Sequence, residues 1–164
     1  MRRAAAALLA LSILGGVTVA ASAEHVVFTD APPPPEGKVL VYLYRTPNAA
    51  FAVRNAAFYF DGQQFVDLLP KDYTYIYVKP GHHELRQDWP WWPGDFWLTF
   101  KRLRKPVDLE LGKVYYFRFW TDVDIGGTQM DFTWNLDPVP DDTGKTELQG
   151  MDFQAPDPKV ADGF

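Results

Sequence analysis

Short runs of β-branched and aromatic residues, bounded by Gly, Pro, Asn and Asp, follow one another from Lys38 to Leu136. Such runs are typical of β-strands, and the residues between them are typical of turns. The same stretch has no long segment with the three- and four-residue apolar spacing of an amphipathic helix. About eight strands with so little helix predict an all-β fold, either a sandwich or a small barrel, and we favour the antiparallel β-sandwich.

Three parts of this pattern are specific. Residues 38–45 (KVLVYLYR) and 114–120 (VYYFRFW) are apolar at nearly every position, which is typical of strands buried on both faces. Asp61 and Gly62 lie between two apolar runs and predict a hairpin, because Gly tolerates a positive φ. Residues 128–136 (TQMDFTWNL) alternate between apolar and polar positions, as a strand with one buried face does.

The first 23 residues contain the three parts of a secretory signal peptide. Arg2 and Arg3 precede an apolar run, and the small residues Ala, Ser and Ala end it. A permanent anchor helix is the alternative, but this run is rich in Ala and contains two Gly residues, whereas a membrane span needs about 20 strongly apolar residues. We expect cleavage before Glu24 and an exported protein, periplasmic or extracellular.

The remaining chain divides into three segments. Residues 24–37 form a lead-in with four consecutive prolines, which cannot join a sheet ladder and which we expect to serve as a linker. Residues 38–153 are the predicted sandwich domain. Residues 154–164 are polar and contain proline, so we expect a flexible tail.

The charge and the cysteine count restrict the partners. The sequence has 16 Lys and Arg against 21 Asp and Glu, and the signal segment holds two Arg and no acidic residue. An acidic chain has no general affinity for nucleic acid or anionic lipid. Since there is no cysteine, neither disulfides nor a thioether lipid anchor are available, and packing of the 26 aromatic residues must stabilise the domain. We expect no nucleic-acid partner and no stable membrane insertion after signal cleavage.

Several segments together resemble a bacterial family of secreted and lipid-anchored envelope proteins, known as domain of unknown function 2846. The resembling segments are PPPPEGKVLVYLYR, FYFDGQQFVDLL, YTYIYVKPGHHEL, VDLELGKVYYFRF and KTELQG. The resemblance implies a β-sandwich domain of the cell envelope and brings no known activity or catalytic residue. This chain differs from many relatives in lacking the lipidation cysteine and in carrying a Trp-Pro-Trp-Trp-Pro insert.

That insert lies in residues 87–100 (QDWPWWPGDFWLTF), which contain four of the six tryptophans. Prolines on both sides of Trp91 and Trp92 prevent a regular central strand, so we expect these two rings on a loop. Rigid aromatic faces suit stacking on sugar rings or docking into a protein groove, with Lys101 and Arg102 as electrostatic support. The alternatives are that the two rings form a lid over the core and that the basic run, Lys101, Arg102, Arg104 and Lys105, marks an edge strand.

No catalytic, cofactor or metal motif stands out. Asp88 and Asp95 bracket the tryptophans, and two carboxylates beside aromatic rings predict an alternative function, an envelope polysaccharide hydrolase. His82 and His83 are adjacent on a predicted strand and point to opposite faces, which disfavours a shared metal ion. We therefore expect no cofactor, no metal and no enzymatic activity.

The sequence as a whole favours a non-catalytic binding or structural module of the bacterial cell envelope. Its expected ligand is a glycan or a protein, contacted through Trp91, Trp92, Lys101 and Arg102. A purely structural partner in an envelope complex is the third class of function that remains open.

Overall fold

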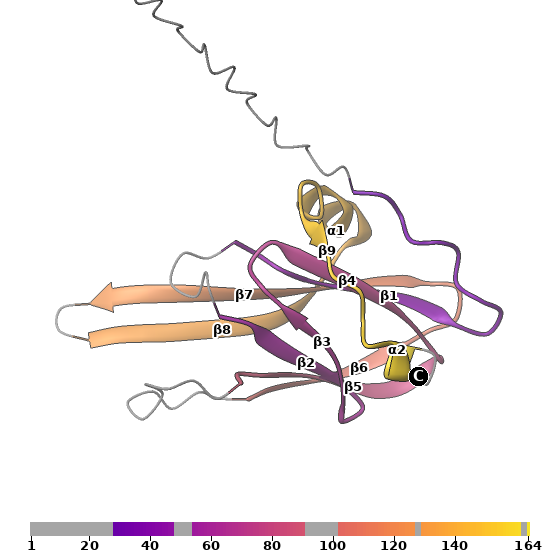
Figure 1. The fold of residues 1–164 in the computed structure, drawn as a ribbon, viewed down its shortest axis with the longest axis horizontal. Coiled ribbons are helices and arrows are strands. Elements are labelled where there is room, and N and C mark those ends of the chain that lie inside the picture. Colours follow the sequence, from indigo (N-terminus) through magenta and orange to yellow (C-terminus); the bar gives the residue numbers. More distant parts are fainter. Residues whose placement is uncertain (1–27, 48–53, 91–101, 127–128, 162–163) are drawn as a thin grey trace, which may run out of the picture.

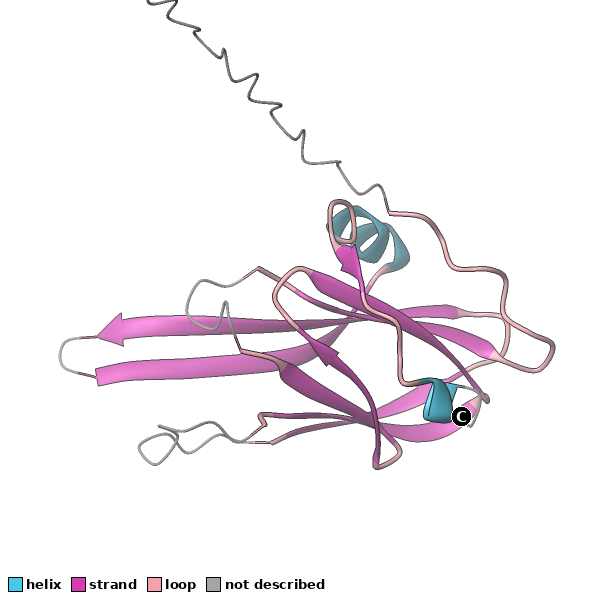
Figure 2. Cartoon of the chain, in the orientation of Figure 1, coloured by secondary structure: helices cyan, strands magenta, loops and turns pink. Residues whose placement is uncertain are grey.

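The computed structural model describes residues 28–47, 54–90, 102–126, 129–161 and 164, without the side chains of residues 123–131 and 161. In these residues, strands form two facing sheets and two short helices lie at their margins (Figures 1 and 2). Sheet A has the order β8-β7-β1-β4-β9, with β1 Val39–Arg45, β4 Asp72–Val78, β7 Val114–Gly126, β8 Gln129–Val139 and β9 Asp152–Phe153. Sheet B has the order β3-β2-β5-β6, with β2 Ala56–Phe60, β3 Gln63–Leu68, β5 Gly81–Asp88 and β6 Leu103–Leu109. The helices are α1 (Asp141–Glu147) and α2 (Pro158–Ala161). This architecture confirms the predicted all-β sandwich.

Most neighbouring strands are antiparallel, as predicted, but two pairs are parallel. β1 pairs in parallel with β7, and β4 pairs in parallel with the two-residue β9. Parallel neighbours cannot be joined by a tight turn. The chain accordingly builds β4 and all of sheet B between β1 and β7.

β1 lies at the centre of sheet A and is buried at every position, as its sequence predicts. Val39, Val41 and Leu43 belong to the core between the two sheets. Leu40, Tyr42 and Tyr44 face the opposite way and belong to a second buried cluster on the outer face of sheet A. A strand that is covered on both faces is apolar on both faces, which explains the unbroken run of apolar residues.

The outer face of sheet A is covered in part by the lead-in segment. The Phe28 ring contacts the rings of Tyr42 and Tyr73 at centroid distances of 5.8 and 5.6 Å. The Ala31 amide donates a hydrogen bond to the Tyr42 hydroxyl oxygen (2.7 Å), and the Tyr77 hydroxyl donates to the carbonyl of Pro32 (2.7 Å). Residues 28–32, part of the expected linker, are thus packed on the domain.

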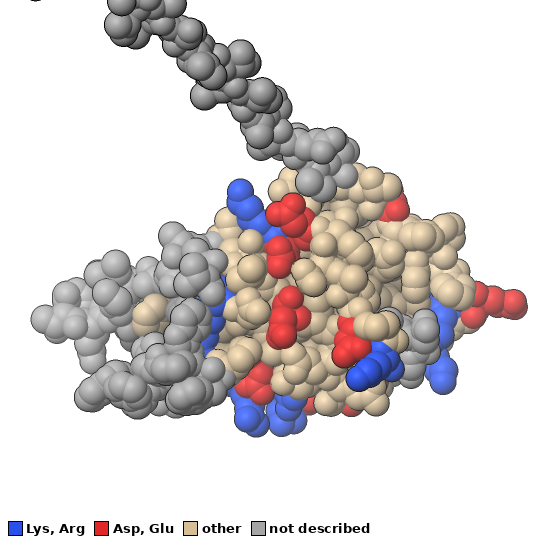
Figure 3. Space-filling view, viewed as in Figure 1, with Lys and Arg blue, Asp and Glu red and all other residues tan. Residues whose placement is uncertain are grey.

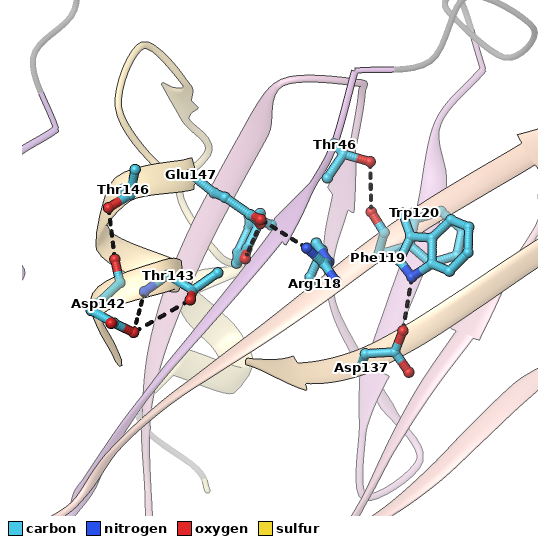
Figure 4. A network of polar contacts seen from close by, with 10 residues as sticks. Thr46, Arg118, Phe119, Trp120, Asp137, Asp142, Thr143, Thr146 and Glu147 are labelled. Carbon is cyan, nitrogen blue, oxygen red and sulfur yellow. Dashed lines mark hydrogen bonds and ion pairs between the residues drawn. The ribbon is translucent and has the colours of Figure 1, made fainter. Parts of the chain in front are cut away.

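Helix α1 packs on this face at β7, where Gly144 meets Tyr116, and is held by one carboxylate (Figure 4). Glu147 accepts a hydrogen bond from the Tyr44 hydroxyl (2.6 Å) and forms an ion pair with Arg118 (2.7 Å). Burial, reinforced by the Glu147 charge, raises the pKa of Tyr44 far above its usual range, so this hydroxyl stays a donor at physiological pH. Gly144 lets the helix approach closely, because its Cα faces the ring of Tyr116.

The end of the chain also packs on the sandwich. Phe164 is buried, and its ring contacts those of Phe60 and Phe65 at 5.1 and 6.2 Å. The Lys38 ammonium donates a hydrogen bond to the Phe164 carbonyl oxygen. The segment 154–164, for which we expect a flexible tail, therefore supplies a side chain to the core between the sheets.

The predicted hairpin at Asp61 and Gly62 is confirmed. It joins β2 to β3, and both residues have a positive φ, 47° and 83°. Such paired left-handed conformations match the twist of a two-residue hairpin. Among the helices of the described residues, none is long and apolar enough to cross a membrane.

Candidate functional site

The predicted site residues fall partly within the structure. Asp88 ends β5, and Arg102 immediately precedes β6. The Arg102 Nε lies 3.2 Å from Asp88 Oδ1, so an ion pair joins the two ends of the stretch 88–102. This stretch contains four tryptophans, and we call it the tryptophan-rich segment. The other predicted residues, Trp91, Trp92, Asp95 and Lys101, lie outside the described residues.

The segment begins at a buried ring. Trp89 is 8% exposed and packs edge-on against Phe119 and Trp134, with centroid distances of 5.9 and 6.1 Å. The guanidinium groups of Arg45 and Arg54 each lie 5.3 Å from the centre of the Trp89 ring. Trp89 is therefore a core residue, and cation–π attraction from both guanidinium groups stabilises its ring.

The two arginines link this ring to the backbone around it. Arg45 is fully buried and donates hydrogen bonds from Nη1 to the carbonyl oxygens of Arg54 and Leu68. Arg54 donates from Nη2 to the carbonyl of Pro90 (2.7 Å). Desolvation lowers the pKa of Arg45 to about 10, which leaves the guanidinium charged at neutral pH. The start of the tryptophan-rich segment is thereby fixed to β1 and to the residues before β2.

A groove lies on the outer face of sheet B beside this point. Asp67 on β3 and Asp88 on β5 both pair with Ala57 of β2, so the three residues form one row across the sheet. Gln64 and Arg86 flank Tyr59 in the same way in the next row. Cross-strand partners share a face, and small Ala57 leaves a depression between the two carboxylates. We name this depression the Ala57 groove; it has a volume of about 390 Å³ and is lined by Ala57, Tyr59, Gln64, Asp67, Asp88, Trp89, Pro90 and Arg102.

The two carboxylates of the Ala57 groove have different environments. Asp67 lies at the rim, where surrounding protein atoms desolvate its carboxyl group and raise its pKa, opposed by a hydrogen bond from the Gln64 amide (3.0 Å). Asp88 is more enclosed and is paired with Arg102, whose side chain is 64% exposed. On the same face, the Arg86 guanidinium lies 3.9 Å from the centre of the Tyr59 ring. The groove therefore combines hydrogen-bond acceptors, an amide, a cation and an aromatic ring.

The adjacent histidines do not meet, as predicted. His82 Nδ1 contacts Asp108 (2.8 Å), whereas His83 Nδ1 contacts Asp61 (2.7 Å) and its ring packs on Phe60. Within the part of the chain that the structure describes, no three His, Cys, Asp or Glu residues are grouped to hold a metal ion.

The described part of the basic run, from Arg102 to Lys105, lies at a sheet edge. β6 is the last strand of sheet B, and its Arg104 pairs with Glu84 of β5 at 3.4 Å. Charges and a proline, Pro106, on such a strand discourage edge-to-edge association. This supports the edge-strand alternative for Arg104 and Lys105, while Arg102 turns to Asp88 in the groove.

Sequence reasoning missed Tyr59, Gln64 and Asp67. They come from a hairpin that ends about twenty residues before the tryptophans, and only the strand order β3-β2-β5 brings the two regions together. The β2–β3 register also shifts between Phe58 and Tyr59, so counting back from the Asp61-Gly62 turn misplaces the pairs.

Comparison with known proteins adds a family and no activity. The sequence profile of the family described as protein of unknown function (DUF2846) matches residues 35–128, more than half of the chain and the whole lining of the Ala57 groove. Comparison with curated proteins and with solved structures finds no match. The resemblance seen in the strand and turn segments is thus borne out at the level of the family, and the chain belongs to the DUF2846 family of proteins of unknown function.

Proposed function

We propose that the protein is a non-catalytic binding module of the bacterial cell envelope and that it binds a glycan in the Ala57 groove. The observation that carries this proposal is the position of the groove at the base of the tryptophan-rich segment. Asp88, Pro90 and Arg102 line it, and the chain between Pro90 and Arg102 contains Trp91 and Trp92. Because Trp91 and Trp92 directly follow Pro90 in the chain, we infer that their aromatic rings extend the Ala57 groove.

The lining suits hydroxyl groups. Each sugar hydroxyl donates and accepts hydrogen bonds, and the groove provides acceptors at Asp67 and Asp88 and donors at Gln64 and Arg102. Its volume falls within the range of small-ligand sites, roughly 300 to 1,000 Å³. A protein partner would favour a more apolar pocket for aromatic anchors, so the four polar side chains of the lining, Gln64, Asp67, Asp88 and Arg102, support a glycan over a protein.

Export and an envelope location rest on the sequence. The signal-like first 23 residues and the envelope character implied by the family resemblance support this part of the proposal. Detection of the chain in the periplasmic or extracellular fraction, starting at Glu24, tests it. A chain that keeps its first residues in the cytoplasmic fraction contradicts it.

The binding test uses the mature protein, residues 24–164, and a panel of envelope polysaccharides and their oligomers. Titration calorimetry compares wild type with Asp67→Asn, Asp88→Asn and a Trp91→Ala, Trp92→Ala double variant. Removing a charged hydrogen-bond partner is expected to weaken binding about tenfold. Asp108→Asn, an exposed position of the same sheet whose side chain is 84% exposed, is the matched control and is expected to bind as wild type does.

The outcomes separate the two parts of the site. Loss of binding in the Asp variants supports the groove, and an additional loss in the tryptophan variant extends the site onto the loop. Full binding by Asp67→Asn and Asp88→Asn refutes the groove as the ligand site. If no glycan of the panel binds wild type, the proposed function is wrong.

One observation favours a second candidate, the envelope hydrolase. Asp67 and Asp88 flank Ala57, so their Cα atoms are two strand spacings, or about 10 Å, apart on one face of the sheet. Inverting glycosidases likewise use two carboxyl groups that are separated widely enough to admit a water molecule. The raised pKa of Asp67 suits an acid, while Asp88 is ion-paired. Turnover that is lost in Asp88→Asn and Asp95→Asn but kept in Asp67→Asn would favour the pair expected from the sequence. Turnover that is lost in Asp88→Asn and Asp67→Asn but kept in Asp95→Asn would favour the pair in the groove. Absence of turnover by wild type on the panel rejects this candidate.

A further inference from the structure

A second groove lies at the edge of sheet B. It has a volume of about 430 Å³ and is lined by Gln64, Phe65, Val66, Asp67, Gln154, Ala155 and Asp157. One wall is β3, and the other is the segment that follows β9. We name it the Asp157 groove.

The second wall is held at both ends by backbone hydrogen bonds. The Gln154 amide donates to the carbonyl of Tyr73 in sheet A, and the Asp157 amide donates to the carbonyl of Phe65 in sheet B, at 2.8 and 2.7 Å. Residues 154–157 therefore bridge the edges of the two sheets. A wall fixed in this way needs little ordering when a ligand binds, which favours affinity.

The two grooves meet at the edge strand. Gln64 and Asp67 of β3 line both of them, and β3 has only β2 as a strand neighbour in the described part of sheet B. Asp67 therefore stands between the two grooves, and a ligand that extends beyond the Ala57 groove past this residue reaches the lining of the Asp157 groove. The continuous surface suits an extended chain more than a single sugar.

The joint lining is acidic. It contains three carboxylates, Asp67, Asp88 and Asp157, against one cationic side chain, Arg102, which is paired with Asp88. A discontinuous band of acidic side chains also crosses the face of the molecule shown in Figure 3. Carboxylates bind ammonium groups through charge-assisted hydrogen bonds and repel acidic ligands.

We propose that the ligand is a linear glycan that spans both grooves and carries free amino groups, with Asp67 and Asp157 as the residues that contact them. The proposal rests on the proposed function and adds the chemistry and the length of the ligand. A uronic-acid polymer is disfavoured by the same carboxylates.

The experiment measures the affinity of the mature protein for β-1,4-linked glucosamine oligomers of two to six units. Matched series of N-acetylglucosamine and galacturonate oligomers serve as neutral and acidic probes. The affinity is expected to rise with the length of the oligomer and to be highest for the amino series, lower for the neutral series and lowest for the acidic series. Added salt is expected to weaken binding of the amino series. Oligolysine of equal charge is the control for attraction to any polycation.

Two variants locate the ends of the ligand. Asp157→Asn is expected to weaken the hexamer roughly threefold to fivefold and to leave the dimer unchanged, because only the longer chain reaches the second groove. The substitution keeps the oxygen that accepts the Lys159 amide at the start of α2, so the fold is retained. Asp67→Asn is expected to weaken both oligomers, and Asp108→Asn neither.

Each remaining outcome has one meaning. A hexamer that binds no tighter than the dimer, no effect of Asp157→Asn, or equal affinity for the acidic series overturns this inference while glycan binding stands. Oligolysine that binds as tightly as the amino hexamer assigns the grooves to basic peptides and also overturns it. If none of the glycan series binds, the proposed function itself fails.

Discussion

Replacing Gly144 with alanine tests how α1 is docked on sheet A. In the interior of an exposed helix, alanine is more stable than glycine by about 1 kcal/mol, so this substitution normally stabilises. Gly144, however, is buried, and a Cβ placed there would lie 2.4 Å from two ring atoms of Tyr116, Cγ and Cδ1. A contact that short forces the ring or the helix to move.

Neither can move cheaply. The Tyr116 ring is stacked on that of Tyr42, with centroids 4.9 Å apart, and Glu147 fixes the end of the helix through Tyr44 and Arg118. Overpacking of a filled core costs about 1–3 kcal/mol. With the upper part of that range for so short a contact, and the gain in helix propensity subtracted, we expect Gly144→Ala to lower the free energy of unfolding by about 2 kcal/mol.

Urea denaturation followed by tryptophan fluorescence measures this change. Lys145→Ala on the exposed side of the same helix is the control and is expected to stay within about 0.5 kcal/mol of wild type. An unchanged or increased free energy of unfolding for Gly144→Ala would show that α1 does not need its close approach to Tyr116, and would refute the packing argument.

Three other predictions concern the site and the core. Trp89→Ala is expected to lower the free energy of unfolding by about 3–5 kcal/mol, because it empties a core position and removes the contact with two guanidinium groups. The Trp91→Ala, Trp92→Ala double variant is expected to have the free energy of unfolding of wild type. If urea denaturation shows equal losses for the two variants, all three rings are core residues. Phe164→Ala is expected to cost about 3 kcal/mol, and no change in the melting temperature would mean that its ring adds nothing to the core. The folded-state pKa of Asp67 is raised, so the folded protein favours its protonated form, and stability is lost as the pH rises from the unfolded-state pKa through the folded-state one. Asp67→Asn is therefore expected to be more stable than wild type at pH 7 and to show no such gain at pH 3; the same difference at both pH values would contradict the assignment.

Local patterns in the sequence predicted the local parts of the fold. The unbroken apolar run of β1 predicted a strand buried on both faces, and Asp61-Gly62 predicted the hairpin. Both depend on neighbouring residues only. The parallel pairing of β1 with β7 and the docking of α1 depend on contacts between distant segments, which periodicity does not encode. The helix itself is short and contains Gly144, so its propensity is weak and its packing on Tyr116 determines it.

The candidate site was predictable to the same extent. The prolines and tryptophans drew attention to the chain between Asp88 and Arg102, and those two residues do meet. Asp67 could not be found in this way, because a carboxylate on a β-strand is common and its neighbour across Ala57 follows only from the strand order and the register. The C-terminal wall of the Asp157 groove, residues 154–157, could not be predicted for a different reason. Its polar composition with proline is typical of a flexible tail.

The anchored start of the tryptophan-rich segment has a consequence for protein engineering. Trp89 anchors one side in the core, and the ion pair between Asp88 and Arg102 joins the two sides at 3.2 Å. A segment of another length or sequence can therefore replace the residues between Pro90 and Arg102 without substituting a described core side chain. In these terms the sandwich is a display scaffold, and residues 91–101 are an exchangeable cassette whose replacement leaves the described core side chains in place.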